Sequence, residues 1–324
     1  MPALDEIPAE DAASSAPQVV TVSTCAAGLD EAGLRRRRAL RHLDALRQAA
    51  GAGGLVRSQE LELSAGWHAA YLSRNGLRSA PTVHAETAGL PGFTGADPFV
   101  RMRTAGYRPA YATEVIGDVG STAGDSDCVD HLMNTIYHAA LLLSRVTEAG
   151  VAFGEGAYAG TCTIDLGTPL GATSEPGPGP GPGPGPGEIV RYPWPGMVAT
   201  VGSFQVGSEN PRPPPSRLPN ANAGLPVLAG LRNADFLAAA PAAHVEIQRF
   251  DLSDSNGRLV PSVVFADSLI SGRGVVSDVG LHGLFAALVP EVPLLPGRYQ
   301  VTLRATIGTQ AIASTPWWFS VAAP

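Results

Sequence analysis

An unbroken alternation of proline and glycine, PGPGPGPGPGPG at 176–187, constrains the fold of this chain more than any other feature. Proline lacks the backbone donor that helix and sheet ladders need, and glycine loses much conformational freedom on ordering. Such a run is typical of a solvated spacer between folded units, so we expect a Pro/Gly linker over 171–187. The acidic, Ala- and Pro-rich start of the chain predicts a further disordered segment over 1–32.

Composition limits the classes of partner. The chain has 324 residues, 44% hydrophobic and 16% charged, so it is globular and long enough for two domains with their own cores. Its formal net charge of -7 argues against nucleic acid and anionic membranes, since both attract a basic surface. No apolar run reaches about 18 residues, so we expect no transmembrane segment. The first residues have neither a basic region nor an apolar core, so we expect no signal peptide in the given chain.

Before the spacer, apolar residues at helical spacing predict four helices, which begin near residues 34, 58, 98 and 126. In the third helix we expect Asp97 to be the N-cap and Phe99 and Met102 to face inward. The segment 150–167 has the alternation and turn residues of one or two strands. Helices interspersed with short strands predict a layered α/β unit.

Polar residues on these helices allow more than one interpretation. If the fourth helix is continuous, His131, Asn134 and His138 lie on one of its faces. His68 lies beside the apolar stripe of the second helix, and we expect it to be a packed, hydrogen-bonded core histidine. The arginines at 35–38 fall mostly on a solvated helix face, which we favour over a nucleic-acid patch.

The three cysteines form no C-x-x-C motif, which disfavours a thiolate zinc site. Cys128 precedes the fourth helix, and Cys162 lies in the strand-like segment after it. The two residues could pair in an oxidising compartment, or they could be small buried or free thiols. The sequence leaves both alternatives open.

After the spacer the pattern changes to strands. About seven short segments alternate in hydrophobicity and are separated by turn residues: 198–204, 226–231, 243–251, 258–266, 281–290, 297–306 and 311–321. The Pro-Gly turn before Tyr299 is typical of a tyrosine corner, in which the hydroxyl bonds back to the backbone. In the last segment only alternate residues of Trp317, Trp318 and Phe319 can face the core. We therefore expect 188–324 to form an independent antiparallel β-sandwich.

The residues with most chemical potential lie between Val83 and Gly154. Within VHAE at 83–86, YATEVIG at 111–117 and HLMNTIYHAALLL at 131–143 stand His84, Glu86, Glu114 and His138. Two histidines and a carboxylate can form an open zinc site with water in the fourth position. The same four groups can instead form a hydrogen-bonded polar cluster that only orders a cleft. Both interpretations fit the residue types.

In the order of these motifs, residues 33–170 resemble a CAP domain, the superfamily of cysteine-rich secretory, antigen 5 and pathogenesis-related 1 proteins. WHAAYLSRNG at 67–76 is similar to the family's second helix, and VHAE, ATEVIG and the segment around His138 follow in the family's order. Thr113 and Val115 replace the usual Gly and Asn, no Pro-Gly precedes His138, and Asn134 falls near the second glutamate's place.

The resemblance implies an α-β-α sandwich with a cleft, so the expected fold class is α+β. It implies that the cleft is lined by His84, Glu86, Glu114, Asn134 and His138. Among these, His84, Glu114 and His138 would be the ligands of a divalent metal, with zinc as the first candidate. YPWPG at 192–196 and ENPRPPP at 209–215 are similar to a bacterial type with an immunoglobulin- or fibronectin-like β domain at 188–324. The family implies a secreted or periplasmic protein.

The function expected first is a non-catalytic extracytoplasmic binding protein whose His/Glu cleft holds a divalent metal or a small or lipidic ligand. The alternative is a metal-dependent, protease-like hydrolase that uses both cleft histidines and a glutamate. A structural surface protein with a vestigial cleft is the second alternative. The sequence has no G-x-S-x-G and no H-E-x-x-H, so a covalent hydrolase has no support.

Overall fold

The computed structural model describes residues 30–76, 82–120, 124–171, 189–231, 244–282, 284–308, 310–313 and 315–323. The predicted spacer at 176–187 and most of the predicted disordered segment lie outside these ranges. The boundary at residue 32 was wrong by two residues, because the first helix begins at Glu31. Asp30 sets this start, since its side chain accepts a hydrogen bond of 2.8 Å from the Gly33 amide.

The first unit contains five α-helices and one four-stranded sheet in the described ranges. The helices are α1 (Glu31–Ala50), α2 (Gln59–Asn75), α3 (Pro98–Thr104), α4 (Asp127–Met133) and α5 (Tyr137–Leu142), with the 3-10 turn η1 (Gly156–Tyr158). The strands are β1 (Val56–Arg57), β2 (Pro109–Asp118), β3 (Glu148–Phe153) and β4 (Thr161–Pro169). They lie in the order β1-β3-β4-β2, with β1 parallel to β3 and the other pairs antiparallel.

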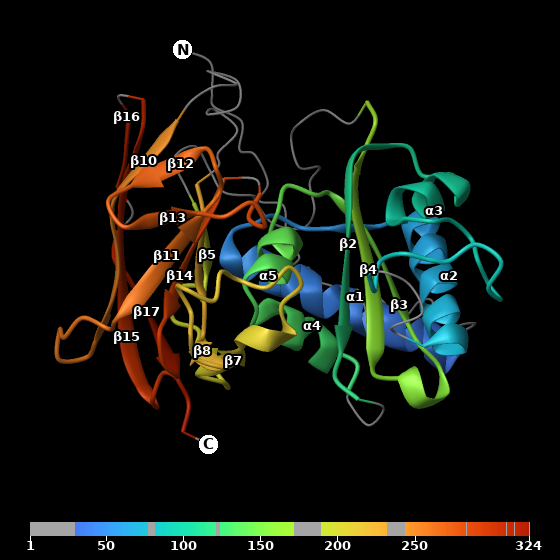
Figure 1. Ribbon diagram of the computed structural model, residues 1–324, viewed down its shortest axis with the longest axis horizontal. Helices are drawn as coiled ribbons and strands as arrows, with labels where there is room; N and C mark the ends of the chain where they lie inside the picture. The colour runs from blue at the N-terminus through green and yellow to red at the C-terminus, as the bar shows by residue number, and fades with distance from the viewer. Residues whose placement is uncertain are drawn as a thin grey trace, which may run out of the picture.

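Helices cover both faces of this sheet. The helices α2 and α3 pack on one face, and α1, α4 and α5 lie on the other, between the sheet and the second unit (Figure 1). Gly150 permits the close approach of α2, because a Cβ at this position would meet the Glu62 amide nitrogen at 2.0 Å. The predicted layered arrangement of helices and strands is therefore observed.

The helix α1 buries an arginine that its periodicity places on the apolar side. Arg47 is fully buried and donates to the carbonyls of Leu142, Ser144 and Val146, the last two at 2.9 and 3.0 Å. Burial lowers the pKa of Arg47 to about 10, so the guanidinium remains charged at neutral pH. Arg47 thereby fixes the loop after α5 against α1.

Two helix predictions need correction. Met102 is fully buried as predicted, but Phe99 is 48% exposed, because Arg101 takes the inward position of the short helix α3. The fourth helix is not continuous either, because it is divided into α4 and α5. His131, Asn134 and His138 therefore do not share the face of one helix. At the break, the Thr135 hydroxyl donates to the Leu132 carbonyl at 2.7 Å, which satisfies a carbonyl at the end of α4.

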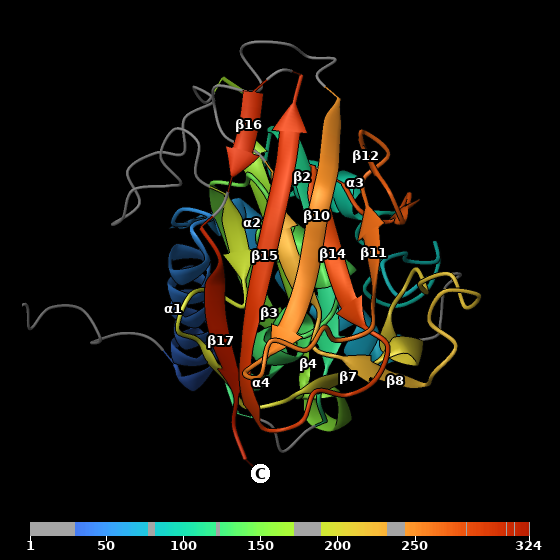
Figure 2. The ribbon, with the colours of Figure 1, turned by 90° about the vertical axis from the view of Figure 1, so that its left-hand side faces the viewer.

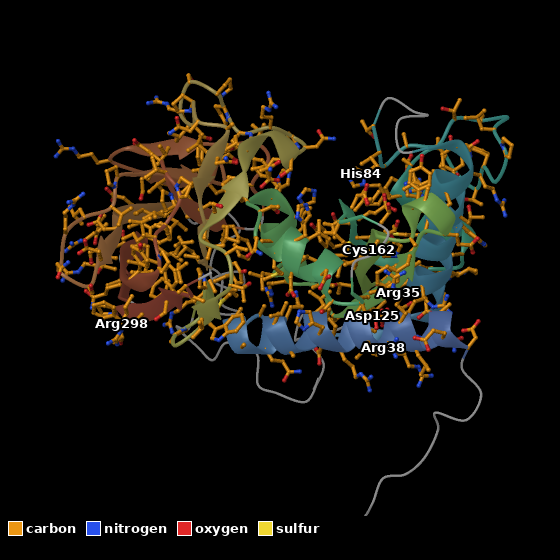
Figure 3. All side chains as sticks on the ribbon, turned by 90° about the horizontal axis from the view of Figure 1, so that it is seen from below. Arg35, Arg38, His84, Asp125, Cys162 and Arg298 are labelled. Carbon is orange, nitrogen blue, oxygen red and sulfur yellow. A yellow bond between two sulfur atoms is a disulfide. The ribbon has the colours of Figure 1, made fainter. Side chains whose placement is uncertain are left out.

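The arginines of α1 are ion-paired as well as solvated. Arg35 lies 3.3 Å from the Asp125 carboxylate, which also pairs with Arg38 (Figure 3). Arg36 lies 3.1 Å from Glu62. Such pairs at a partly exposed surface contribute little to stability. They engage Arg35, Arg36 and Arg38 of the basic run with carboxylates of the same chain.

Cys128 and Cys162 form a disulfide between α4 and β4, and both are fully buried. Of the two alternatives that the sequence left open, the structure has the paired one. The bond lies in the hydrophobic core on the α1 side of the sheet and joins that helix layer to the sheet.

The second unit consists mainly of strands in the described ranges. These are β5 (Val190–Tyr192), β6 (Val198–Ala199), β7 (Ser203–Gln205), β8 (Asn222–Gly224), β9 (Val227–Gly230), β10 (Val245–Asp254), β11 (Ser262–Ala266), β12 (Ile270–Gly272), β13 (Val275–Ser277), β14 (Phe285–Pro290), β15 (Gly297–Ile307), β16 (Gln310–Ala313) and β17 (Trp317–Val321). A 3-10 turn, η2 (Val206–Ser208), follows β7.

These strands form two larger sheets and one small hairpin. One sheet has the order β12-β10-β15-β17-β6 with β16 beside β15, the second has the order β13-β11-β14-β9-β5, and β7 pairs with β8. The two larger sheets stack, with β14 and β11 behind β10 and β15 in Figure 2. The expected purely antiparallel pattern was wrong in part, because β10–β12, β11–β13 and β17–β6 are parallel pairs. Of these partners, β12 and β13 are short strands that the alternation did not reveal, whereas β6 lies within the predicted segment 198–204.

Local predictions in this unit are confirmed. The Tyr299 hydroxyl donates to the Leu295 carbonyl at 2.8 Å, as expected for a tyrosine corner. Trp317 and Phe319 are buried and Trp318 between them is half-buried, as strand alternation requires.

The two units share a continuous buried core. It includes α1, α4 and α5 as well as strands after residue 189, although none of the described later strands pairs with β1–β4. Across this contact the Tyr137 hydroxyl donates to Asp278 at 2.7 Å, and the Tyr192 hydroxyl donates to Asn134 at 2.9 Å. Independent folding of 188–324 remains a prediction.

Candidate functional site

His84 and Glu114, two of the predicted site residues, are paired. The Nδ1 atom of His84 lies 2.9 Å from the Glu114 carboxylate. Glu114 is buried in the middle of β2, whereas His84, in the loop before α3, has a side chain that is 27% exposed. The pair therefore presents one partly accessible imidazole ring, which is fixed from behind by a carboxylate.

Arg101 holds the Glu114 carboxylate in place. Its Nη2 atom donates to both carboxylate oxygens, at 2.9 and 2.7 Å, and its Nη1 atom donates to the His84 carbonyl at 3.0 Å. Arg101 is fully buried because α3 directs it inward beside Met102. One guanidinium thus positions both members of the His84–Glu114 pair.

Glu86 belongs to the same network on its inner side. Its carboxylate lies 2.9 Å from Nδ1 of His68, accepts from the Thr94 amide at 2.6 Å, and lies 3.8 Å from the Arg101 Nε atom. The other ring nitrogen of His68, Nε2, donates to the Val83 carbonyl at 2.9 Å, so His68 is the hydrogen-bonded core histidine that the sequence predicted. Glu86 orders the loop that carries His84.

The pKa values of two buried acids on adjacent strands, Glu114 on β2 and Asp165 on β4, are shifted in opposite directions. Burial alone would raise the pKa of Glu114, but the hydrogen bond from His84 and the charges of His68 and Arg101 outweigh it and lower this pKa to about 2. Burial, followed by the Glu114 charge, raises the pKa of Asp165, its cross-strand neighbour, well above its usual range. Glu114 is therefore anionic at neutral pH, and Asp165 is favoured as the neutral acid.

The structure places His138 and Asn134 elsewhere. His138 lies on α5, on the opposite face of the sheet from α2, with its Nδ1 atom 3.2 Å from the Thr135 hydroxyl and 3.4 Å from Glu209. Asn134 accepts a hydrogen bond from Tyr192. Of the five predicted cleft residues, the structure gathers His84, Glu86 and Glu114, and it does not bring Asn134 or His138 to them.

The arrangement does not fit a shared divalent metal. Among the described residues, no group of three or more His, Cys, Asp or Glu side chains is placed to hold an ion, so His84, Glu114 and His138 form no such group there. Both Glu114 oxygens already face a guanidinium, whose positive charge opposes a cation at the same carboxylate. We derive no chemistry through a metal at this position.

Sequence reasoning missed Arg101, Asp165 and Glu209. Arg101 lies three positions after Pro98 in a short helix, and its sequence context does not distinguish a buried arginine from an exposed one. In β4, Thr163 and Asp165 alternate with apolar residues. This spacing indicates that their side chains share one face of the sheet, and both side chains are buried there. Glu209 contacts α5 from more than 70 residues away, and no local pattern reports such a contact.

None of the helices that the structure describes is both long and apolar enough to span a membrane. No protein-family model matches the chain, and no curated protein matches it in sequence.

Proposed function

We propose that the protein is a CAP-type extracytoplasmic binding protein whose ligand contacts the exposed edge of His84. The observation that carries the proposal is the asymmetry of exposure in the network. Glu114, Glu86, His68 and Arg101 have fully buried side chains, whereas His84 is 27% exposed. A rigid buried scaffold that offers one polar group to solvent is suited to binding, since its geometry is set before the ligand arrives.

Exposed apolar side chains on the loop and the helix that hold the network favour a ligand with an apolar body. The loop and helix that hold the network expose Phe93 at 39%, Phe99 at 48% and Val100 at 42%. The hydrogen bonds of Arg101, which follows Val100, tie this helix to the backbone of His84. Exposed apolar residues on the elements that fix a polar group are consistent with a ligand or lipid contact. A lipidic molecule with a single polar group, such as a fatty acid or a sterol, fits these features best.

The location outside the cytoplasm rests on the disulfide. Cys128 and Cys162 are paired and buried, and stable disulfides are typical of secreted and periplasmic proteins. The motif order that resembles the CAP superfamily supports the same location.

The metal-dependent hydrolase is the weaker candidate. It requires His138 beside His84 and Glu114, and His138 is instead engaged by Glu209 and Thr135. A structural surface protein with a vestigial cleft would have no reason to keep His84 exposed and fixed at once.

Fluorescence titration of the full chain with a dansyl-labelled fatty acid and with a fluorescent sterol tests the proposal. We expect saturable binding of at least one probe, with about tenfold weaker affinity in His84→Ala, because one hydrogen bond is lost. Phe99→Ser is expected to weaken binding as well. The matched control is His282→Ala, since His282 is exposed and lies in the second unit.

Two results would refute the proposal. The first is the absence of saturable binding for both probes. The second is equal affinity in His84→Ala and His282→Ala, which would place any bound lipid elsewhere on the surface. Circular dichroism of each variant shows whether the fold is kept.

A further inference from the structure

A separate pocket lies where the two units meet. It has a volume of about 480 Å³. It is lined by residues at the end of α4, by the hairpin β7–β8 and by residues just before and after β7: His131, Asn134, Thr135, Val201, Ser203, Phe204, Gln205, Ser208 and Asn222. Pockets that bind small molecules commonly measure about 300–1,000 Å³. The pocket is therefore large enough for a ligand of sugar size.

The wall of this pocket is rich in neutral hydrogen-bonding groups. Gln205 and Asn222 are directly opposite each other in the β7–β8 pair, and Ser203 lies two residues before Gln205, so all three share one face of the hairpin. On the other wall, Asn134 accepts from the Tyr192 hydroxyl through its amide oxygen, so its NH2 group is what it can offer to a ligand. None of the lining residues is Asp, Glu or Arg.

The nearest ionisable groups do not add charge to the wall. Burial, and then the proximity of His138, lower the pKa of His131, which keeps its imidazole neutral at neutral pH. Glu209 does not line the pocket, and one oxygen of its buried carboxylate accepts from the Ile136 and Tyr137 amides while the other lies 3.4 Å from His138. The pocket thus offers amides, hydroxyls and a neutral imidazole, with no fixed charge among its lining residues.

We infer that this pocket binds a small, neutral, polyhydroxylated ligand such as a mono- or disaccharide. A neutral ligand with many hydroxyls can pair with amide and hydroxyl groups that both donate and accept. An anionic ligand would meet no guanidinium, and a cationic ligand would meet no carboxylate. This site is independent of the one proposed at His84, because the two sets of residues have no member in common.

The position of the pocket gives the ligand a second effect. His131, Asn134 and Thr135 belong to the first unit, whereas Ser203, Gln205 and Asn222 belong to the second. A ligand that bonds to both walls stabilises the packed arrangement of the units, and it must raise the melting temperature of the whole chain as its concentration rises.

Titration followed by ¹H–¹⁵N NMR and by thermal unfolding tests this inference with glucose, N-acetylglucosamine and trehalose. The charged counterparts are glucose 6-phosphate and glucosamine. We expect at least one neutral sugar to bind with a Kd of about 1 mM or tighter and to shift the backbone signals of the lining residues. The double variant Gln205→Ala/Asn222→Ala is expected to weaken this binding at least about tenfold, because two hydrogen bonds are lost.

The matched control is Gln59→Ala/Asn256→Ala, which removes one amide of each kind from exposed positions that do not line the pocket. It is expected to bind like the unmodified chain. The inference is overturned if no neutral sugar binds at a sugar concentration of about ten times that Kd, or if both double variants bind the sugar with equal affinity. Tighter binding of either charged sugar would overturn the assignment of a neutral ligand. Lipid binding at His84 is expected to be unaffected by either double variant, so the two proposals fail separately.

Discussion

Two histidine–glutamate pairs of this protein have similar composition and different surroundings. In the first, His84 and Glu114 are 2.9 Å apart and share the buried guanidinium of Arg101. In the second, His138 and Glu209 are 3.4 Å apart, and the carboxylate is met by the backbone amides of Ile136 and Tyr137. The first pair lies within one unit and reaches solvent, whereas the second lies across the contact between units.

The difference indicates that the structural role of a His–Glu pair depends on the group that binds its carboxylate, a guanidinium in the first pair and backbone amides in the second. A buried arginine supplies a full positive charge and leaves the imidazole edge free for a ligand. Backbone amides at the start of a short helix bind one oxygen of the second carboxylate, so this carboxylate joins two segments of the chain. The first pair therefore holds a partly exposed imidazole in a fixed position, and the second pair connects the two units.

The largest expected effect comes from Arg101→Met. This change leaves the buried carboxylates of Glu86 and Glu114 without their cation, and breaking a buried pair in this way costs about 3–5 kcal/mol of unfolding free energy. Denaturant unfolding measures the loss. Arg103→Met, on the exposed side of the same helix, is the control and is expected to change stability by less than about 0.5 kcal/mol. A loss below about 1 kcal/mol for Arg101→Met would mean that the network contributes little to the fold.

A smaller loss is expected from Glu209→Ala. Removing this carboxylate leaves the buried amides of Ile136 and Tyr137 without their acceptor, at a cost of about 2 kcal/mol. Thermal unfolding is the measurement, and Glu291→Ala is the control because Glu291 is an exposed acid of the same unit. If both variants melt alike, Glu209 does not join the units.

Asp97→Ala is expected to cost about 1 kcal/mol, because the Asp97 side chain accepts from the Val100 amide at 3.0 Å and caps α3. Asp97→Asn retains a capping oxygen and is expected to remain close to the unmodified stability. Since α3 carries Arg101, the loss should also increase hydrogen exchange at His84. Equal stability of the Ala and Asn variants would show that the helix does not depend on this cap.

Asp165→Asn is expected to change the free energy of unfolding least of these variants at pH 4. The difference from the unmodified chain should grow as the pH rises. The folded pKa of Asp165 is raised, so the unfolded chain ionises first and stability falls above about pH 3.9 until the folded pKa is reached. Glu114, with a lowered pKa of about 2, has the opposite sign, so its contribution is lost as pH falls from about 4.3 toward 2. Melting temperatures between pH 2 and 9 should therefore decline less on the alkaline side in Asp165→Asn. An identical alkaline slope in both proteins would contradict a neutral Asp165.

Local features of the fold were predictable from sequence because each has a short-range physical signal. Asp97, Pro98 and the glycine after α3 mark a helix, and the Pro-Gly turn before Tyr299 marks a tyrosine corner. The break between α4 and α5 was not predictable, because Glu209 satisfies its amides from a distant part of the chain. The short parallel partners β12 and β13 likewise depend on tertiary contacts and not on their own alternation.

The candidate site was predictable in part for the same reason. His84, Glu86 and Glu114 were identified from residue type, and two of them pair with core residues, Arg101 and His68, that complete the network. The assignment of His138 to this site rested on the predicted motif order and on a continuous helix face. The observed division of that helix places His138 beside Glu209 instead.

The most direct test of the separation of the two pairs is a zinc titration of the chelator-treated protein, followed through the imidazole ¹H–¹⁵N signals of His84 and His138. We expect that the two sets of signals do not shift together at one equivalent of zinc. Simultaneous, saturable shifts of both imidazoles with a common dissociation constant would contradict it, because one ion would then bind both histidines.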